Sequence, residues 1–500
     1  MQVNDNNLLK ILLAGALLTA ISIIFVPLDI LESDNLANHG VQQQLASQAE
    51  AALEQHIEIP ASIPDAIPAA VKVNSNSQPL DASKHDEDKS KRDASYHQPP
   101  VKYHTVFSTG CSTFQDWQSY VFFYHAVQSG QEGHITRIAS GCEGDTKDEL
   151  ERIFQDEIAS MDPERLHLHQ TPEFGKSGGL KKSFKYFNKP FGMRHWFENV
   201  LGYPENHAEH DDSIVILLDP DQILLRPFTD DFTHSSETWR LKDDSKHKLK
   251  VEHGSPFSQQ YGYGLQWFTK VNQTYVFDGP TPVATMTKQE AADYYNAMGP
   301  PYVATAKDMY AIAKTWSTIV PRVRDQYPFL LAEMFAFNIA AAHLGLRHTL
   351  AFSFMVSDVG TGGEGWPLVE KVEDKDVCHN FPKSEYPHVI HYCQRYLLGK
   401  WFIGKYRLRK DFISCDAPLL TVPPGDIALK YKRGLYPGNN KVKEMQPRHV
   451  KGNAFMVCAM ISALNEAAVY YKDHHCDKAT ANYNYTYTFF NDMTLPEDTA

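Results

Sequence analysis

The sequence predicts an α/β fold built on a mostly parallel sheet. Residues 104–109 (HTVFST) and 134–140 (HITRIAS) have the composition of buried strands, and residues 114–130 between them show helical spacing of apolar residues and end at Gly130. A strand, a helix and a strand joined by short turns form a βαβ unit, in which the two strands run parallel. The third observation is the aliphatic run Ile214–Leu218, because such fully apolar strands are typical of the centre of a parallel sheet.

Other segments alternate between the two kinds of element. The expected elements are a helical region at 180–200, a short strand and a helix within 299–316, a helix at 328–346, a strand leading into a loop at 389–402, and an amphipathic helix at 453–471.

The N-terminal part has a different character. The uncharged apolar run 11–28 is close to the roughly 20 residues that cross a bilayer. Lys10 before it and three acidic residues shortly after it favour a cytosolic N-terminus and a luminal remainder. A cleaved signal peptide is the alternative, but the length of the run and the missing small-x-small site after it favour an uncleaved anchor. The polar stretch that follows has the composition of a disordered stalk.

These observations divide the chain into five parts. The predicted parts are a cytosolic tail at 1–10, a transmembrane signal anchor at 11–28, a disordered luminal stem at 29–101, a folded α/β domain at 102–428, and a C-terminal helical extension at 429–500.

Charge and cysteine content limit the possible functions. The net charge is −13, from 48 basic and 61 acidic residues, so no basic field argues for nucleic-acid binding. The seven cysteines include no CxxC pair, which argues against a zinc knuckle. In an oxidising lumen some should pair, and Cys111 with Cys142 is the best candidate because both follow strands that should be neighbours. Asn272 (NQT) and Asn484 (NYT) are acceptable glycosylation sequons in a luminal domain.

Two carboxylates, Asp219 and Asp221, follow the aliphatic run directly. Ligands of open α/β sheets bind beyond the carboxyl ends of the strands, and Pro220 between the two acids stiffens the loop. Two carboxylates this close repel each other unless a cation lies between them, and Mg²⁺ or Mn²⁺ prefers oxygen ligands from carboxylates and phosphates. The pair therefore predicts a metal site for a diphosphate, with an ordinary strand-ending turn as the alternative.

A phosphatase of the haloacid dehalogenase type offers another interpretation of this loop. Such enzymes place D-x-D-x-[TV] after an aliphatic strand, and the first Asp is the nucleophile. Here Ile223 occupies the fifth position, the motif follows a complete βαβ unit, and no later GDxxxD-like cluster is present. The interpretation as a metal site for a diphosphate is therefore favoured.

Three further residues are candidates for the same site. His391 follows a short aliphatic strand and offers a nitrogen ligand, although a hydrogen-bonded core histidine is the alternative. Lys400 could hold a phosphate, and Lys189 could neutralise a nucleotide, although each is also an ordinary surface lysine by type.

Several long motifs, in this order, resemble the hydroxyproline O-arabinosyltransferase-like family, which includes plant and algal peptidyl serine α-galactosyltransferases. The motifs cover 104–142, 188–196 (NKPFGMRHW), 216–228 (ILLDPDQILLRPF), 255–264, 299–316, 330–348 and 388–396 (HVIHYCQRY). The similarity extends from about Tyr103 to Pro424, and the helix NAFMVCAMISALNEAA resembles the serine galactosyltransferase branch. The resemblance implies a GT-A-like fold, a single-pass type II protein of the Golgi or endoplasmic reticulum, and hydroxyproline-rich secreted or cell-wall proteins as acceptors.

The resemblance also assigns residues. It implies metal and diphosphate binding at Asp219 and Asp221, and His391 resembles the late metal-ligand histidine of related retaining transferases. In those relatives a Gly-Lys-Pro-Trp element follows the histidine closely, whereas here Lys400 follows at a longer interval and the Pro is missing. Ser108 and Thr109 match the place where a GT-A fold seats uridine, with ordinary turn residues as the alternative.

The expected reaction is transfer of galactose or arabinofuranose from a UDP-sugar to a Ser or hydroxyproline hydroxyl, assisted by Mn²⁺ or Mg²⁺. The resemblance implies retention, in which a UDP phosphate oxygen could take the acceptor proton and no protein base is required. Glu333 and Asp358 are candidates for contacting the sugar or the acceptor, with structural roles as the alternative. The rival classes are the phosphatase and a non-catalytic membrane-anchored binding protein.

Overall fold

The computed structural model describes residues 101–179, 183–241, 248–361, 364–378, 386–438 and 441–487. The predicted cytosolic tail, transmembrane segment and stem lie outside the described residues, apart from residue 101. The predicted helical region at 180–200 is described from residue 183 onward.

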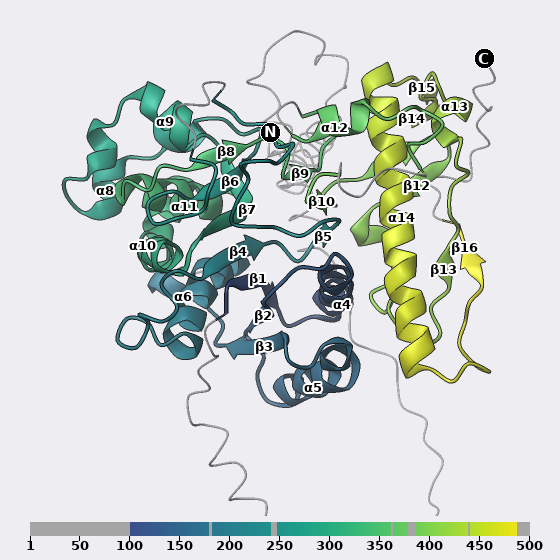
Figure 1. Cartoon of the computed structure of the whole chain (residues 1–500), viewed down its shortest axis with the longest axis horizontal. Helices are drawn as coiled ribbons and strands as arrows, with labels where there is room; N and C mark the ends of the chain where they lie inside the picture. Colours follow the sequence, from purple (N-terminus) through teal and green to yellow (C-terminus); the bar gives the residue numbers. More distant parts are fainter. Residues whose placement is uncertain are drawn as a thin grey trace, which may run out of the picture.

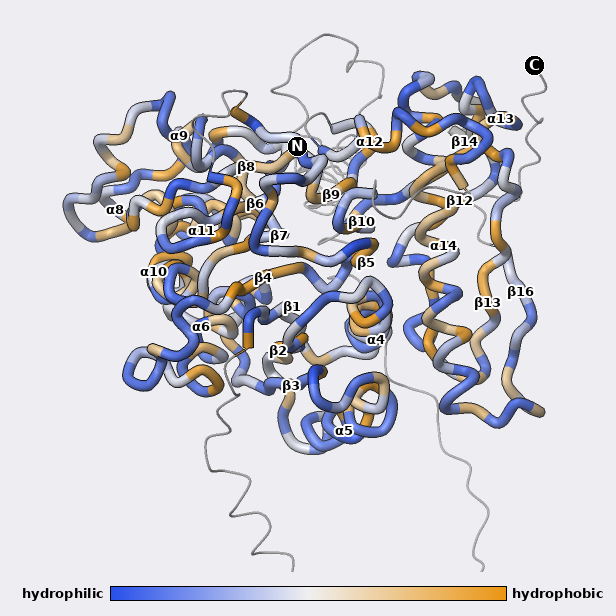
Figure 2. Tube along the Cα trace, in the orientation of Figure 1, coloured by the Kyte–Doolittle hydropathy of each residue, from blue (hydrophilic) through white to orange (hydrophobic). Residues whose placement is uncertain are grey.

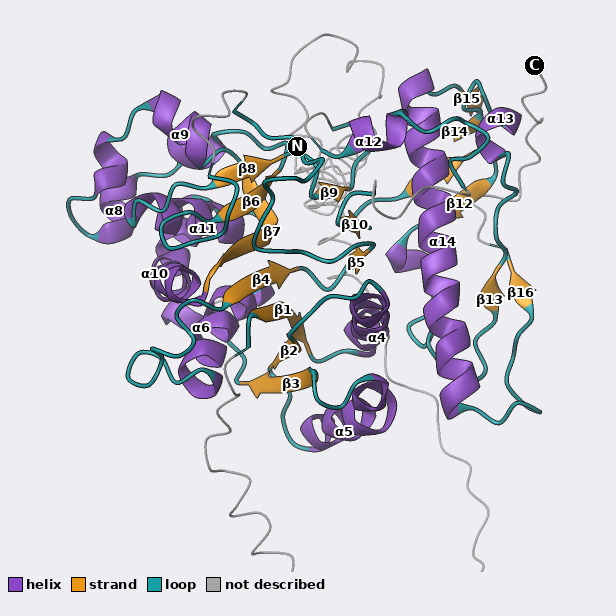
Figure 3. Ribbon diagram, viewed as in Figure 1, coloured by secondary structure: helices purple, strands orange, loops and turns teal. Residues whose placement is uncertain are grey.

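A seven-stranded sheet organises the described part of the chain (Figure 3). Its strands are, in spatial order, β3 (Leu166–Thr171), β2 (His134–Ser140), β1 (Tyr103–Gly110), β4 (Ile214–Leu218), β7 (Met298–Thr305), β6 (Phe257–Gln260) and β8 (Thr349–Ala351). Strands β3, β2, β1 and β4 are parallel neighbours, β6 and β8 also pair in parallel, and β7 is antiparallel to both β4 and β6. The α/β class with a mostly parallel sheet is therefore confirmed, with β7 as the reversed strand.

The predicted βαβ unit is present at the start of the domain. Helix α4 (Thr113–Gln128) connects β1 to β2, and these strands pair in parallel from His104 opposite His134 onward. Ser112 caps the helix, because its side chain accepts a hydrogen bond from the backbone N–H of Gln115. Gly130 follows the helix with φ of 76°, a left-handed conformation that glycine adopts without steric cost.

Helices cover both faces of the sheet (Figures 1 and 2). Phe107, Ile216 and Leu218 point to one face and join the hydrophobic cluster that includes residues of α4. Val106 and Leu217 point to the opposite face, which α6 (Asn188–Val200), α10 (Ala306–Gln326) and α11 (Ala332–His343) cover. This alternation along β1 and β4 buries the strands on both sides, as the continuous aliphatic run predicts.

Six further α-helices of the described residues are short, with at most nine residues each. They are α5 (Asp145–Ile153), α7 (Gln266–Lys270), α8 (Gln273–Phe277), α9 (Lys288–Tyr294), α12 (Trp366–Glu370) and α13 (Ile427–Lys430).

A small three-stranded sheet continues directly from β4. Strand β5 (Gln222–Leu224) pairs antiparallel with β10 (Val389–His391), and β10 pairs in parallel with β9 (Met355–Val356). His391 therefore lies opposite Gln222, one residue after Asp221. The pairing brings together two segments that are about 170 residues apart in sequence.

The later part of the chain contains short two-stranded pairs and one long helix. The pairs are β11 (Tyr396–Leu398) with β12 (Trp401–Ile403), β13 (Leu419–Leu420) with β16 (Tyr485–Thr486), and β14 (Tyr436–Gly438) with β15 (Lys441–Lys443). The segment 389–402, expected to be a strand leading into a loop, thus contains β10 and a hairpin as well.

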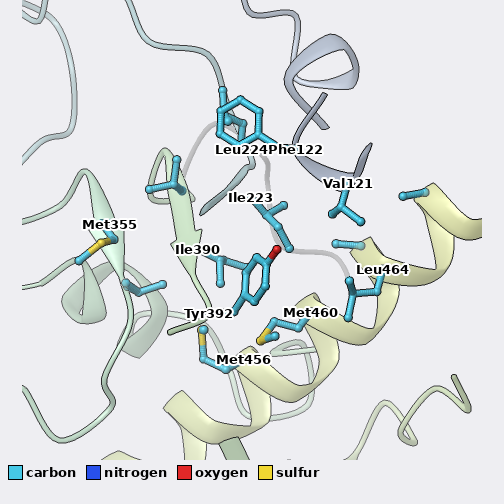
Figure 4. Close-up of a cluster of buried hydrophobic side chains, with 14 of the residues drawn as sticks. Val121, Phe122, Ile223, Leu224, Met355, Ile390, Tyr392, Met456, Met460 and Leu464 are labelled. Atoms are coloured by element: carbon cyan, nitrogen blue, oxygen red, sulfur yellow. The ribbon is translucent and has the colours of Figure 1, made fainter. Parts of the chain in front are cut away.

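Helix α14 (Pro447–His475) contains the predicted C-terminal helix and packs against the rest of the domain. By length and composition it could cross a membrane, yet 67% of its most apolar window is buried within the protein. Figure 4 shows Met456, Met460 and Leu464 of α14 beside Ile223 and Tyr392. The helix therefore packs against β5 and against Tyr392, the residue after β10.

Candidate functional site

The carboxylate pair lies at the carboxyl end of β4. Asp219 and Asp221 connect β4 to β5, and the β1–β4 register pairs Phe107 with Leu218. Ser108 follows Phe107 and Asp219 follows Leu218, so both residues lie at the same edge of the sheet. This is the edge at which open α/β sheets bind ligands.

Three predicted metal ligands converge at this edge. Ligand atoms of Asp219, Asp221 and His391 all lie within 4.8 Å of one another. Two carboxylates and an imidazole suit a divalent cation such as Mn²⁺, with positions left for water and phosphate oxygens. The residues therefore fit the implied metal.

Asp221 is held between two cationic side chains. Its Oδ2 lies 2.6 Å from Nζ of Lys405, and its Oδ1 lies 3.3 Å from Nε2 of His391. Burial alone would raise the pKa of Asp221, but Lys405 and His391 outweigh burial and hold this pKa well below its ordinary range. Asp221 is therefore ionised and able to bind a cation.

Asp219 has its own lysine. Nζ of Lys189 lies 2.6 Å from Oδ1 of Asp219 and 3.5 Å from Oε1 of Glu333. Burial lowers the pKa of Lys189, but the two carboxylates more than compensate and raise it above the ordinary value. Lys189 comes from the first turn of α6, so the structure brings this predicted residue to the carboxylate pair.

Glu333 lies next to Lys189, in the first turn of α11. Its side chain is 5% exposed, and burial, which Lys189 only partly offsets, raises the pKa of Glu333 to about 7. With its pKa at about 7, the carboxyl group of Glu333 is partly protonated near neutral pH, whereas a solvent-exposed glutamate is almost fully ionised there.

The lysine that contacts Asp221 is Lys405, which the sequence alone does not point to. It follows β12, and its side chain is 11% exposed. Lys400 is exposed between β11 and β12. The chain contains two Gly-Lys-aromatic steps, Lys400 before Trp401 and Lys405 before Tyr406, and only their folding distinguishes them.

The other predicted nucleotide contacts lie at the end of β1. Ser108 and Thr109 are both buried there. The hydroxyl of Thr109 accepts a hydrogen bond of 2.9 Å from Nε of Arg137, a buried residue of β2 whose guanidinium also pairs with Asp116. Thr109 thus has a structural partner at this edge.

Asp358 caps a loop near the site. Its Oδ1 accepts a hydrogen bond of 2.8 Å from the backbone N–H of Gly360, which is the loop-cap role given as its alternative. The neighbouring buried Glu364 accepts hydrogen bonds from the N–H and the hydroxyl of Ser357, and burial raises the pKa of Glu364 to about 8.

The remaining site predictions concern covalent modification. The structure pairs Cys111 with Cys142, the pair that the sequence analysis named, and leaves Cys393 as the free cysteine. It also pairs Cys378 with Cys458 and Cys415 with Cys476. The sequon residues Asn272 and Asn484 are both exposed.

A family match covers the first half of this site. Residues 103–238, which include β1 to β5, match the N-terminal domain of the hydroxyproline O-arabinosyltransferase family. The resemblance found in the sequence motifs is confirmed over this range.

Two curated relatives extend the match. The chain is 24% identical over 383 residues to a peptidyl serine alpha-galactosyltransferase of Arabidopsis thaliana, which covers 75% of this chain and 39% of that protein. It is 26% identical over 125 residues to the protein of the same name from Chlamydomonas reinhardtii, which covers 25% of this chain and 14% of that protein. The chain thus spans about two fifths of the Arabidopsis relative at most.

Solved structures of glycosyltransferases are distantly similar. The galactosyltransferase LgtC, in complex with donor and acceptor sugar analogs, matches with a TM-score of 0.33 at 12% identity, over 58% of this chain and 87% of that chain. The apo form of the glycosyltransferase GlyE of Streptococcus pneumoniae TIGR4 matches with a TM-score of 0.28 at 11% identity, over 77% and 66%. Both scores are too low for a shared fold to be inferred.

Proposed function

We propose, from the premise that this chain carries a hydroxyproline O-arabinosyltransferase family domain and is a distant homologue of peptidyl serine galactosyltransferases, that it is a metal-dependent glycosyltransferase with a GT-A-like domain. Its donor is a UDP-sugar, and its acceptor is a Ser or hydroxyproline hydroxyl of a secreted or cell-wall polypeptide. The observation that carries the proposal is the convergence of Asp219, Asp221 and His391 at the carboxyl end of β4.

The charges of the site suit a nucleotide diphosphate. Asp219, Asp221 and His391 would hold Mn²⁺ or Mg²⁺, which, when bound, stabilises the charge that develops on the departing UDP. Lys189 and Lys405 already lie at ion-pair distance from the two aspartates, one on each. Both ammonium groups are available to phosphate oxygens that enter beside the carboxylates.

The sugar transfer requires little acid–base chemistry from the protein. With retention, the acceptor hydroxyl attacks from the face that UDP leaves, and a UDP phosphate oxygen accepts its proton. Glu333 lies beside Lys189 on the α11 side of the pair and contacts the sugar or the acceptor in this proposal. Asp358 stabilises its own loop by accepting the hydrogen bond from the backbone N–H of Gly360.

The cellular setting follows from the same premise. The domain lies in the lumen of the Golgi or endoplasmic reticulum, on a single-pass type II anchor at 11–28 and a stem at 29–101. The three disulfides support this setting, because disulfides persist in oxidising compartments. Glycosylation at the exposed Asn272 and Asn484 would fit it as well.

One assay tests the proposal against its rivals. The purified chain is incubated with UDP-galactose or UDP-arabinofuranose, Mn²⁺ and a peptide rich in Ser and hydroxyproline, and both UDP and peptide mass are followed. We expect UDP release that depends on Mn²⁺ and on the peptide, together with a mass gain of one hexose or one pentose. No UDP release and no mass gain with either donor would favour a non-catalytic binding protein.

The phosphatase alternative predicts Asp219-dependent release of phosphate from monoesters. Such enzymes carry the nucleophile on the first strand of the domain, whereas Asp219 follows β4, the fourth strand in chain order. The family match favours the transferase. Phosphate release from a monoester without UDP release from any donor would reverse this preference.

Lys405 and Lys400 give opposite predictions within this proposal. Lys405→Met removes the ammonium group 2.6 Å from Asp221, so we expect kcat/KM for UDP-sugar to fall by about 10- to 1000-fold. Lys400→Met, at an exposed position nearby, should reduce kcat/KM less than about threefold. Steady-state kinetics of the two matched variants show which lysine contributes to binding of the UDP-sugar. A larger fall in kcat/KM for Lys400→Met than for Lys405→Met would assign the phosphate contact to Lys400.

A further inference from the structure

We propose that Tyr261 is a positioning residue that fixes the imidazole of His391 for metal binding through Nε2. This inference rests on the proposed function, because it concerns the metal ligand His391. Tyr261 follows β6 directly, and its hydroxyl oxygen lies 3.3 Å from Nδ1 of His391. Nε2 of the same ring faces Asp221.

His391 also hydrogen-bonds the side chain of Cys393, but the partners of Tyr261 fix the direction of the contact between Tyr261 and His391. The hydroxyl of Tyr261 lies 2.6 Å from the backbone oxygen of Pro300, which can only accept, so the tyrosine donates its single proton there. The contact with His391 therefore has Nδ1–H as the donor and the tyrosine oxygen as the acceptor. With its proton on Nδ1, the imidazole offers Nε2 to a cation, as ligand histidines do when their other nitrogen is hydrogen-bonded.

The oxygen of Pro300 connects this histidine to the carboxylate loop. It also accepts a hydrogen bond of 3.0 Å from Nε2 of Gln222, a fully buried residue. Oε1 of Gln222 in turn accepts a hydrogen bond of 3.0 Å from the backbone N–H of Asp219. One carbonyl of β7 thus positions both halves of the ligand set, the Asp-Pro-Asp loop through Gln222 and the imidazole through Tyr261.

The tyrosine ring lies in a place that only glycine leaves open. A Cβ atom on Gly299 would lie 2.0 Å from Cε2 of Tyr261, too close for any real contact. The ring therefore occupies the space that a side chain at position 299 would need, which limits where its hydroxyl can lie. The ring of Tyr261 meets that of His391 edge to face, with centroids 6.2 Å apart and planes at 70°.

The chain offers a matched control two residues away. Tyr263 also donates its hydroxyl proton to a β7 carbonyl, that of Met298, and it belongs to the hydrophobic cluster of the face that α6, α10 and α11 cover. Tyr261→Phe and Tyr263→Phe each remove one hydroxyl from one β7 carbonyl. Only Tyr261→Phe removes a partner of His391.

The test measures Mn²⁺ binding by calorimetry on the full chain, and the Nδ1–H signal of His391 by NMR with ¹⁵N-labelled histidine, assigned with His391→Gln. We expect Tyr261→Phe to weaken Mn²⁺ binding by about 10- to 100-fold, and to shift or broaden the Nδ1–H signal. Tyr263→Phe should leave the Mn²⁺ affinity and the Nδ1–H signal unchanged. Its midpoint of thermal unfolding should be no higher than that of Tyr261→Phe, so that a general loss of stability does not account for the difference.

The two readouts separate this inference from the function on which it rests. If the wild-type chain binds no Mn²⁺ but Tyr261→Phe still changes the His391 signal, the metal function fails and the positioning contact stands. If Tyr261→Phe leaves the His391 signal as in the wild type, or binds Mn²⁺ as tightly as Tyr263→Phe does, the positioning role is wrong.

Discussion

Asp221→Asn is expected to reduce UDP release from the donor sugar by at least about 100-fold and to weaken Mn²⁺ binding in parallel. Asn keeps the size of the side chain but loses the negative charge, which a divalent cation requires of its ligands here. Asp221 is also the shared partner of Lys405 and His391, so this single change affects three groups of the site. Steady-state kinetics and calorimetry measure the two losses.

Stability has to be separated from activity in this experiment. Asp221→Asn leaves the buried ammonium group of Lys405 without its carboxylate, and breaking a buried ion pair from one side costs about 3–5 kcal/mol. The double variant Asp221→Asn/Lys405→Met removes both charges. We expect it to regain much of the unfolding free energy in urea but none of the activity.

Asp230→Asn is the matched control for Asp221→Asn. Like Asp221, Asp230 forms an ion pair with a lysine, here Lys102, but it lies at the opposite end of β1. It also accepts a hydrogen bond from the hydroxyl of Tyr103. Its substitution should leave kcat/KM within about threefold of the wild type. Near-wild-type UDP release by Asp221→Asn in the folded state would contradict the role of the carboxylate pair.

The second large effect is expected from the disulfides of α14. The double variant Cys378→Ser/Cys458→Ser opens a cross-link between residues 80 apart in sequence and should lower the free energy of unfolding by about 2–4 kcal/mol. Chemical denaturation of the non-reduced protein measures the change. An unchanged denaturation midpoint would contradict the anchoring role of this bond.

The position of this disulfide adds a functional consequence. Cys378 and Cys415 lie on either side of His391 and Lys405 in sequence, and both are bonded to α14 or its C-terminal cap. Figure 4 shows the same helix packed against the side chains beneath β5 and β10. Loss of the bond should therefore weaken Mn²⁺ binding as well as stability.

Cys111→Ser/Cys142→Ser provides the comparison for this second effect. Its bond joins the ends of β1 and β2 across 31 residues and does not involve the segment that carries His391. We expect this variant to lose stability but to keep its Mn²⁺ affinity. Equal losses of affinity in the two variants would show that α14 has no special part in holding the ligand set.

The elements with strong local patterns could be predicted from the sequence. The aliphatic run of β4 is buried on both faces, as its composition predicts. Because ligands of open α/β sheets bind at the carboxyl ends of the strands, the carboxylates after this run indicate a ligand site there. Strand β3 was not predicted, because its sequence LHLHQT alternates histidine with leucine and lies at the edge of the sheet. Helix α11 begins at Ala332, four residues after Pro328, which lies in the segment that connects α10 to α11.

The site could be predicted in part for a similar reason. Asp219 and Asp221 are adjacent to a recognisable strand, and His391 is the last residue of another. Lys405 and Tyr261 reach the site only through tertiary packing, which places a 3-10 turn after β12 and the residue after β6 beside the carboxylates. Single-sequence periodicity carries no signal for such contacts, so the sequence favours Lys400, whereas the structure places Lys405 beside Asp221.

The most direct test of a metal site formed by Asp219, Asp221 and His391 is anomalous diffraction from crystals of the protein soaked with Mn²⁺ and UDP. One manganese peak should lie between the two carboxylates and Nε2 of His391, with diphosphate density beside it. A manganese peak bound elsewhere, with diphosphate density away from these three residues, would contradict the proposed metal site.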